Sequence, residues 1–477
     1  MMRLLGVTQL ARKNIPCLTD NFAKRSLWLV IIGYWLLLLV WAIFSFSQTD
    51  PNLTLINQPL FINFQNMIWS WGGDRTRLVW IYAGIILSGF VCYGLIYQKL
   101  KQLNLSWEMI SKRWGWKKLV LGYLLFCLPL FFSYNALSHD VFNYIFNAKM
   151  VVVYGANPHV RVALDFAFDN WTRFMHNTHT PAPYAYGWTA LSLLPYVLGF
   201  GKFFSTWLMF RLMAFGSILL LAYSWWRYAK IADIKLKFHE LVLVLLNPLV
   251  LIEVISNQHN DLWMMAPAIL GLVLIASSQK NKWPMVGGWL LFGLSISIKY
   301  ASLLLLPFYF WVIIASSLDK LLEKRLPQFI TRWFMKQHQI ISLTLKLMPL
   351  PVSIMMFLPL LLPRAQQFHP WYLLWVMVWI PLLPLMDEGN THRGLWQVIA
   401  KTKLFQAIVG LRNWWIGLII IFSLTSMLRY APWLLSGGFS QSVLEQQKFI
   451  TWSAVGISLV WWIISRFSKQ TNLRKLT

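Results

Sequence analysis

The sequence predicts an all-α protein that crosses a membrane many times. Of its 477 residues, 58% are hydrophobic and only 12% are charged, whereas soluble domains carry roughly 25% charged residues. The hydrophobic residues gather in runs that approach the roughly 20 residues needed to cross a bilayer. The 29 tryptophans suit helix ends at the level of the lipid headgroups. These observations exclude a soluble globular domain.

The apolar runs and the charges between them predict twelve membrane-spanning helices, with both chain ends in the cytoplasm. Basic residues concentrate in connections such as 98–118 and 227–237, and basic connections stay on the cytoplasmic side. The run at 188–200 is apolar enough to span, but counting it would place 227–237 outside. We therefore expect an interfacial or re-entrant helix there, on the outer face. The predicted spans are 27–47, 78–97, 119–136, 205–225, 240–256, 261–278, 284–298, 300–317, 340–362, 370–386, 411–428 and 450–466.

The net charge of +26 would suggest a nucleic-acid partner in a soluble protein. Here the basic residues lie in short connections between apolar runs, where they face anionic lipid, so we expect no nucleic-acid partner. Cys17, Cys92 and Cys127 show no metal-site spacing and predict no disulfide framework. His176 and His179 form a His-x-x-His pair without an evident third ligand, so we expect no metal site.

One long connection, 137–204, is predicted on the outer side, and long ordered loops tend to be functional. It begins with Ser138-His139-Asp140-Val141. A carboxylate at this place is either a helix-end residue or a general base, which must be positioned against a substrate hydroxyl. His139 points elsewhere on a helix, so Asp140 is the first catalytic candidate.

A second polar group is the sequence Asn-Gln-His-Asn-Asp at 257–261, between two apolar spans. It could be a plain tight turn. It could also be part of a site, because polar groups at membrane depth are functional candidates. Glu253 lies inside the preceding span, and we expect it to pair with Lys299 or Arg211.

Three cations, Arg211, Lys299 and Arg364, fall at the outer ends of predicted spans. Any one of them could simply extend its charge to the interface. Together with His369 they predict a site for an anionic ligand, such as a lipid phosphate, at the outer leaflet.

Five motifs occur in order along the chain, and together they resemble a known family. They are SHDVFNYIFNAKMVVVYGANPH (138–159), TPAPYAYGWTALS (180–192), NPLVLIEVISNQHND (247–261), GLSISIKYASLLLLPF (293–308) and HPWYLLW (369–375). Over roughly residues 119–386 the chain resembles the polyprenyl-phosphate-mannose-dependent α-1,6-mannosyltransferases of bacterial envelope lipoglycan synthesis, a GT-C family.

The resemblance implies a GT-C-like bundle of about 12 transmembrane helices, with an outer-face loop that carries interfacial helices. The whole chain is then one membrane-embedded domain, with N-terminal spans in 1–118, a catalytic core in 119–386 and C-terminal spans in 387–477. The implied reaction moves a sugar, expected to be mannose, from a polyprenyl-phosphate donor to a hydroxyl of a lipid- or glycan-linked acceptor. Inversion, an extracytoplasmic site in a bacterial cell membrane, and no cofactor beyond the lipid-linked sugar are also implied.

The same resemblance assigns roles to particular residues. Asp140, in the pattern Ser-x-Asp-Val, corresponds to the catalytic base. The residues expected to bind the donor phosphate are Lys299, Arg364, His259, His369 and Arg211. The residues expected to shape the acceptor site are Asp261, Asn260, Tyr144, Asn157, Tyr184 and Trp188. The chain departs from the family where Tyr184-Ala185-Tyr186-Gly187-Trp188 replaces the frequent Tyr-Gly-Pro-x-Trp, which leaves the sugar and the acceptor open.

Two other classes remain open from the residues alone. A transporter or lipid flippase would line a pathway with interior charges such as Glu253, Arg211 and Lys346. Against it, the sequence shows no inverted repeat, and the polar residues gather on one predicted side. A lipid-linked-polymer ligase or envelope scaffold would share the outer-face site, and a donor assay separates it from a glycosyltransferase.

Overall fold

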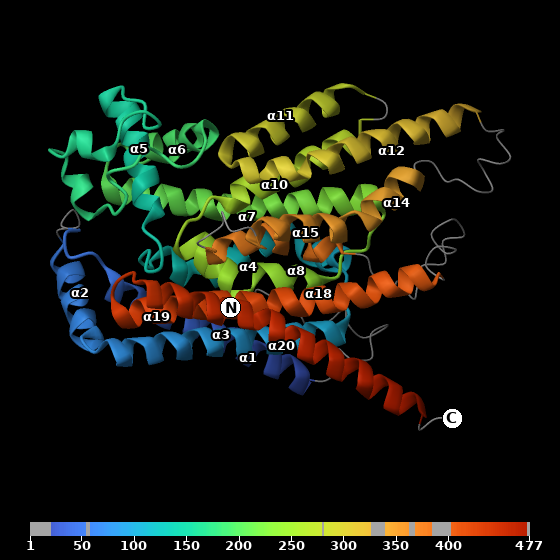
Figure 1. Ribbon diagram of the computed structural model, residues 1–477, viewed down its shortest axis with the longest axis horizontal. Coiled ribbons are helices and arrows are strands. Elements are labelled where there is room, and N and C mark those ends of the chain that lie inside the picture. Colours follow the sequence, from blue (N-terminus) through green and yellow to red (C-terminus); the bar gives the residue numbers. More distant parts are fainter. Residues whose placement is uncertain are drawn as a thin grey trace.

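The computed structural model describes residues 21–53, 58–278, 281–325, 339–361, 368–383 and 402–474. These residues fold almost entirely into helices, and no β-strand forms among them. Long helices run alongside one another, and shorter helices gather at one end of them (Figure 1). This is the all-α polytopic membrane protein that the sequence predicts.

Within the described part, eight helices are long and apolar enough to cross a membrane, or nine if one bent pair counts as a single span. The eight are α1 (Asn21–Ser45), α3 (Arg75–Leu103), α4 (Trp107–Phe131), α7 (Phe203–Ala232), η7 with α12 (Tyr300–Leu305 and Leu306–Arg325), α14 with α15 and η8 (Gln339–Leu347, Pro349–Phe357 and Leu358–Leu361), α18 with α19 (Lys403–Leu428 and Tyr430–Ser436) and α20 (Gln441–Arg474). The bent pair joins α8 (Phe238–Leu245) to α9 and η6 (Pro248–Val250 and Leu251–Ser256) at an angle of 48°.

The sequence predicts twelve spans, and the remaining three coincide with shorter apolar helices of 10–17 residues. They are α10 (Asp261–Ala276), α11 (Trp283–Ile298) and the segment Pro370–Leu382, formed by η9 (Pro370–Leu373), α16 (Leu374–Met377) and η10 (Ile380–Leu382). A helix of this length falls short of the roughly 20 residues that cross a bilayer alone. Apolarity made these segments look like full spans. The protein covers most of α10, whereas α11 has four buried residues and exposes large side chains such as Trp283 and Leu290.

The close approach of α10 and α11 depends on two glycines. A Cβ atom on Gly271 would lie 2.6 Å from the carbonyl oxygen of Gly288, and one on Gly288 would lie 2.6 Å from that of Gly271. Small residues at such a contact let two helices approach closely where lipid provides no hydrophobic drive. The contact holds α10 firmly, and α10 carries Asp261 at its first position.

The basic connections lie together at one end of the bundle. A bridge between Ser106 and Lys237 joins the α3–α4 connection to the α7–α8 connection. Two backbone hydrogen bonds of 2.8 Å flank it, from Trp107 to Leu236 and from Phe238 to Leu105. The charge pattern predicted these two connections, 98–118 and 227–237, on one side of the membrane, and they share one end of the bundle.

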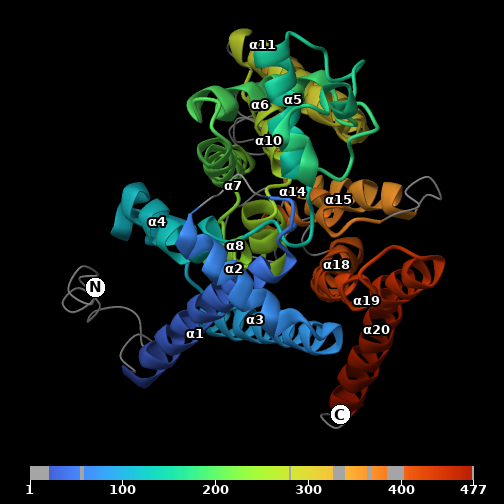
Figure 2. The same ribbon diagram turned by 90° about the vertical axis from the view of Figure 1, so that its left-hand side faces the viewer.

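The long connection 137–204 lies at the opposite end, beyond the length of α7. It contains α5 (Asp140–Tyr154), η4 (Ala163–Phe166), η5 (Asn170–Phe174) and α6 (Tyr186–Leu198). Figure 1 shows α5 and α6 with α2 (Pro59–Gly72) at this end, and Figure 2 shows α5, α6, α10 and α11 grouped on one side of the bundle. At 13 residues, α6 is about 20 Å long and too short to span, as predicted for 188–200.

An interruption of the helix precedes the polar segment 257–261. Asn247 interrupts the helix before Pro248, and its side chain accepts a hydrogen bond of 2.9 Å from the Leu249 backbone. The chain then forms the π-helix η6 and reverses at Gln258, whose φ of 62° is uncommon for a residue other than glycine. Asp261 begins α10 directly afterwards.

Candidate active site

Asp140 accepts hydrogen bonds from two tyrosine hydroxyls. The Tyr184 hydroxyl donates to Asp140 Oδ2 at 2.7 Å, and the Tyr144 hydroxyl approaches the same oxygen at 3.4 Å. The Asp140 side chain is 21% exposed, so a small part of it remains accessible. Tyr184 comes from a segment 44 residues away. These contacts favour a positioned carboxylate over a helix cap, which would bond to nearby backbone.

Aromatic residues that the sequence assigns to the acceptor site surround this carboxylate. The Tyr144 ring centroid lies 5.4 Å from that of Tyr184 and 5.1 Å from that of Trp188. Burial, and then the charge of Asp140, raise the pKa of Tyr184 well above its ordinary value. The same two causes raise the pKa of Tyr144. Both hydroxyls are therefore protonated donors at neutral pH.

Lys299 and Asp261 form an ion pair beside this group. Lys299 lies at the extended break between α11 and η7, and its Nζ is 2.8 Å from Asp261 Oδ1. The Trp375 indole also donates to Asp261 Oδ1, at 2.6 Å. Lys299 Nζ lies 4.9 Å from the ring centroid of Tyr184, within cation–π range. Tyr184 thus connects Asp140 with Lys299 and Asp261, so the structure brings together the three residues expected to converge.

The segment 257–261 is almost completely buried, unlike an ordinary surface turn. His259 Nε2 lies 3.2 Å from Glu253 Oε2, and His259 Nδ1 lies 3.8 Å from Asp140 Oδ2. The His259 ring stacks on Trp371, with centroids 3.7 Å apart and planes at 20°. His259 therefore lies between two carboxylates and not among cations.

Several buried polar atoms of this segment have no hydrogen-bond partner among the described residues. They are both ring nitrogens of His259, both side-chain polar atoms of Asn260, and Asp261 Oδ2. A buried polar group without a partner costs roughly 1–3 kcal/mol. Such groups are uncommon in packed interiors, and their concentration next to Asp140 fits a site that takes a polar ligand.

Arg211 serves the packing of helices. Its guanidinium donates to the backbone of Leu130, to Ser133 Oγ at 2.9 Å, and to the Ser256 backbone at 3.0 Å. It also lies 4.4 Å from the Trp207 ring, and its side chain is fully buried. These partners occupy its N–H donors within the packed helices, so its geometry gives no support to the donor-binding role predicted for it.

The other predicted donor and acceptor residues differ in their placement. His369 stacks on Trp371 with centroids 4.4 Å apart, and desolvation lowers its pKa to about 4, so its ring is neutral at pH 7. Asn157 bonds to the Tyr186 hydroxyl at 3.1 Å and to the His159 backbone, which places it outside the group around Asp140. Arg364 lies outside the described residues.

The His-x-x-His pair belongs to a different contact. His176 Nδ1 lies 2.9 Å from His139 Nδ1, and His176 Nε2 lies 3.5 Å from Asp50 Oδ2. His139 thus turns toward His176, as expected of a residue that points away from the carboxylate of Asp140. Burial lowers the pKa of His139 to about 3. Across the described ranges, no group of three His, Cys, Asp or Glu residues could hold a metal ion.

Sequence reasoning missed some of the residues around this site and misassigned one. The expected partner of Glu253, Lys299 or Arg211, is wrong. Glu253 instead accepts hydrogen bonds of 2.9 Å from the side chains of Asn257 and Tyr430. Trp371 and Trp375 were also missed, although the four-residue spacing of the aromatics in HPWYLLW could have indicated a shared helical face.

Comparison with known proteins identifies the family. A family model described as "Alpha-(1->6)-mannopyranosyltransferase, N-terminal domain" matches residues 55–315, more than half of the chain. The matched region includes Asp140, Tyr184, Asp261 and Lys299, and it ends before the segment around Trp371. No curated protein and no solved structure matches the chain. The chain belongs to the α-(1→6)-mannopyranosyltransferase family.

Proposed function

We propose that this mannosyltransferase-family protein moves mannose from a polyprenyl-phosphate donor to a hydroxyl of a lipid- or glycan-linked acceptor, with inversion, on the outer face of a bacterial cell membrane. The observation that carries the proposal is the carboxylate of Asp140, which Tyr184 holds at 2.7 Å, apart from any backbone cap. The family supports mannosyl transfer. The end of the bundle opposite the basic connections suits an outer site.

In the proposed reaction Asp140 is the general base. It takes the proton of the acceptor hydroxyl while that oxygen forms a bond to the anomeric carbon. The bond from the anomeric carbon to the phosphate oxygen breaks on the opposite face, and its electron pair leaves with the polyprenyl phosphate. The departing phosphate gains one negative charge, and Lys299, which contacts the same Tyr184 that donates to Asp140, is the cation proposed to stabilise it. Arg364 and His369 remain proposed donor-binding residues, whereas His259, which lies between the carboxylates of Asp140 and Glu253, is not proposed to touch the donor. Because phosphate is a good leaving group, we propose that no metal or other cofactor is required.

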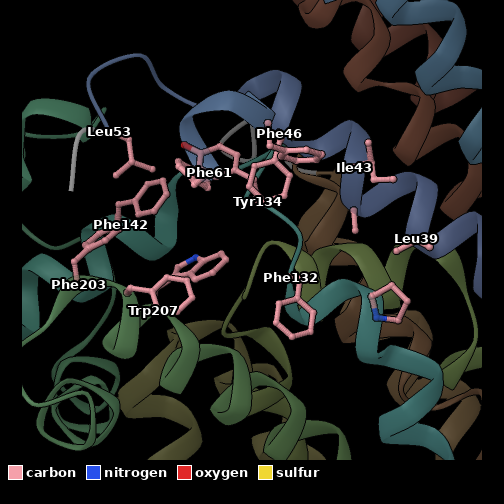
Figure 3. A pocket seen from close by; sticks show the side chains of 14 residues that line it. Leu39, Ile43, Phe46, Leu53, Phe61, Phe132, Tyr134, Phe142, Phe203 and Trp207 are labelled. Atoms are coloured by element: carbon pink, nitrogen blue, oxygen red, sulfur yellow. The ribbon is translucent and has the colours of Figure 1, made fainter. Parts of the chain in front are cut away.

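An apolar cavity next to α5 supports a lipid-linked substrate. Its volume is about 380 Å³, and its lining is almost wholly apolar (Figure 3). Phe142, two residues after Asp140, lines it together with Trp207, whereas Phe132 and Ile43 are exposed toward the outside of the bundle. A cavity that is apolar and adjoins a membrane-facing surface suits a hydrocarbon chain. The lining residues are Leu39, Ala42, Ile43, Phe46, Leu53, Phe61, Phe64, Pro129, Phe132, Tyr134, Phe142, Phe203, Phe204 and Trp207.

The placement of the charged residues favours an enzyme over a transporter. Lys299, Asp261 and Asp140 lie at one end of the bundle, and Glu253 joins them through His259. The other two charges expected to line a pathway have partners elsewhere. Arg211 is held by backbone and side-chain partners, and Lys346 lies 3.9 Å from Asp233 at the far end of α7. A pathway through the membrane would need such groups spread along it.

A transfer assay tests the proposed function. Purified protein in lipid vesicles, given labelled polyprenyl-phosphate mannose and a panel of glycolipid and saccharide acceptors, should release polyprenyl phosphate and form a mannosylated product. The new linkage should have the anomeric configuration opposite to that of the donor. Transfer from a nucleotide sugar, with none from any polyprenyl-phosphate sugar, would contradict the proposal.

Filling the apolar cavity should select against long lipid chains. Ile43→Trp adds bulk to the lining, so it should raise KM for a long-chain donor by about 10-fold, the equivalent of roughly two buried CH₂ groups. KM for a donor with a very short chain should stay within about twofold, because its tail does not reach the cavity. Leu29→Trp, at a lipid-facing position of α1 that is 69% exposed, is the matched control and should change neither value. Equal effects on both donors would exclude the cavity as a lipid-chain site.

A further inference from the structure

A buried carboxylate and a buried histidine stand in line behind Asp140. Glu253 and His259 have almost no exposed surface, and their closest atoms, Oε2 and Nε2, are 3.2 Å apart. The other ring nitrogen of His259, Nδ1, is 3.8 Å from Asp140 Oδ2. We propose that Glu253 and His259 form a proton relay behind Asp140, an inference that rests on the proposed function.

The environment of Glu253 fixes its carboxylate toward the histidine. Tyr430 donates to Oε1 at 2.9 Å, and Asn257 donates to Oε2 at 2.9 Å. Both donors are neutral, so neither balances a buried negative charge. Among the described ion pairs of Glu253, the partner that can become positive is the His259 ring. A buried charge without such a partner is strongly destabilising.

The backbone around the pair is unusual in a way that brings the two side chains together. Glu253 lies in the π-helix η6, and π-helical turns occur frequently at functional sites. Gln258 then adopts a φ of 62°, and the His259 backbone N–H donates to the Glu253 carbonyl at 3.0 Å. This closed turn places the His259 side chain over that of Glu253. Backbone held in sparsely populated conformations is concentrated at functional sites.

The orientation of the His259 ring suits a relay between two carboxylates. Stacking on Trp371, with ring centroids 3.7 Å apart, fixes the plane of the His259 ring, and its two nitrogens point outward within that plane. Nε2 faces Glu253 and Nδ1 faces Asp140, although neither contact yet has hydrogen-bond geometry. A small movement of Asp140 toward Nδ1, from 3.8 Å to about 3 Å, would complete the path.

The relay works with a neutral His259 that carries its proton on Nε2, toward Glu253. Asp140 takes the proton of the acceptor hydroxyl and passes it to Nδ1, while the acceptor oxygen bonds to the anomeric carbon and the phosphate leaves. His259 then carries both protons, and the charge of Glu253 stabilises the positive ring. The proton returns through Asp140 to water when the product departs, which restores the starting state. Glu253 and His259 touch no substrate and act as positioning residues for Asp140.

Other titratable groups face the relay from the elements packed around it. Lys299 and Asp261 already neutralise each other at 2.8 Å. His369, behind Trp371, has a pKa lowered to about 4 and is neutral above that pH. Further groups are Tyr430 and Tyr82 near Glu253, Tyr144, Tyr184, Tyr372 and His139 near Asp140, and Arg429 near Tyr430 and His369. The variants below therefore change the charge of the relay while these neighbours stay as they are.

The test is the pH–rate profile of sugar transfer by Glu253→Gln. The variant keeps the size of the side chain and an oxygen that accepts from Tyr430, but it loses the negative charge. Turnover should fall by about 10-fold or more, with both KM values within about twofold. The negative charge of Glu253 favours a positive ring beside it, so its loss should move the acid limb, the low-pH side of the profile, to lower pH. A merely structural role would lower the yield or Tm and leave the limb in place.

Four further variants separate the relay from a loss of folding. Asp319→Asn, a matched change at a buried carboxylate that accepts from the Ile340 and Ile341 backbones, should leave the profile unchanged. His259→Gln should slow turnover to a similar extent, and Glu253→Gln added to it should cost little more, because residues that act as a unit are not additive. Glu253→Asp keeps the charge and should restore the position of the acid limb.

The outcomes distinguish the relay from the proposed function itself. Suppose that the wild-type protein transfers the sugar. An acid limb that does not move in Glu253→Gln, or rate losses that multiply in the double variant, would then overturn the relay alone. If Glu253→Gln does not fold, the same decision rests on His259→Gln and Glu253→Asp. Absence of transfer by the wild-type protein from any polyprenyl-phosphate sugar would overturn the proposed function and the relay with it.

Discussion

Asp140→Asn should lower the rate of sugar transfer by about 100-fold or more, because general-base catalysis contributes roughly 10²–10⁴-fold. The asparagine side chain has the same shape and can still accept from the Tyr184 hydroxyl, which lies 2.7 Å from Asp140 Oδ2. It cannot take the proton of the acceptor hydroxyl. The affinity for the donor lipid should stay within about twofold, because in the proposed reaction Asp140 meets the acceptor and not the phosphate.

Transfer and donor binding should be measured on the same preparation, after its Tm has been compared with that of the wild-type protein. Asp165→Asn is a suitable control. Asp165 also lies in the segment 137–204, but it pairs with Arg161 at 2.5 Å and has no contact with the residues around Asp140. This control should keep full activity. An Asp140→Asn protein that transfers at the normal rate, or that loses donor binding in step with turnover, would remove Asp140 from the role of base.

Much of the helical framework could be predicted from the sequence, because membrane insertion depends on patterns that are local along the chain. Every predicted span coincides with a helix or a run of short helices. Charge alone indicated that 188–200 does not span, and the structure has a 13-residue helix there. Charge also placed the connections 98–118 and 227–237 together, and Ser106 meets Lys237. The number of spans was less certain, since apolarity does not distinguish a lipid-facing helix from one covered by protein.

Pairings between distant side chains could be predicted only in outline. Asp140, Asp261 and Lys299 were expected to converge because each follows or precedes a span at the same end. The link through the Tyr184 ring could not be foreseen, because it depends on how the loop 137–204 folds back onto the end of α11, where the Ala185 backbone N–H donates to the Ile298 carbonyl. Glu253 shows the limit most clearly. A search for a cationic partner overlooked His259, which a π-helix and a positive φ bring within 3.2 Å.

Lys299→Met should weaken donor binding by about 10-fold or more, because a hydrogen bond to a charged group contributes roughly 1.5–3 kcal/mol. The single change has a second consequence. It leaves Asp261, which is fully buried and lies 2.8 Å from Lys299 Nζ, without its counter-charge. Removing one partner of a buried ion pair costs about 3–5 kcal/mol, so a loss of activity in this variant alone could be a loss of folding.

The double variant Lys299→Met/Asp261→Asn separates the two effects. Its site is neutral, and the amide oxygen of Asn at 261 can still accept from the Trp375 indole, so Tm should recover toward the wild-type value. Donor binding should not recover, since the cation that meets the phosphate is absent. The matched control is Lys149→Met/Asp169→Asn, a second buried Lys–Asp pair in the segment 137–204 with no contact to Asp140, which should bind donor normally. If the Lys299/Asp261 double variant binds donor as tightly as the wild-type protein, the role of Lys299 is to neutralise the buried charge of Asp261. The phosphate must then be bound by other residues.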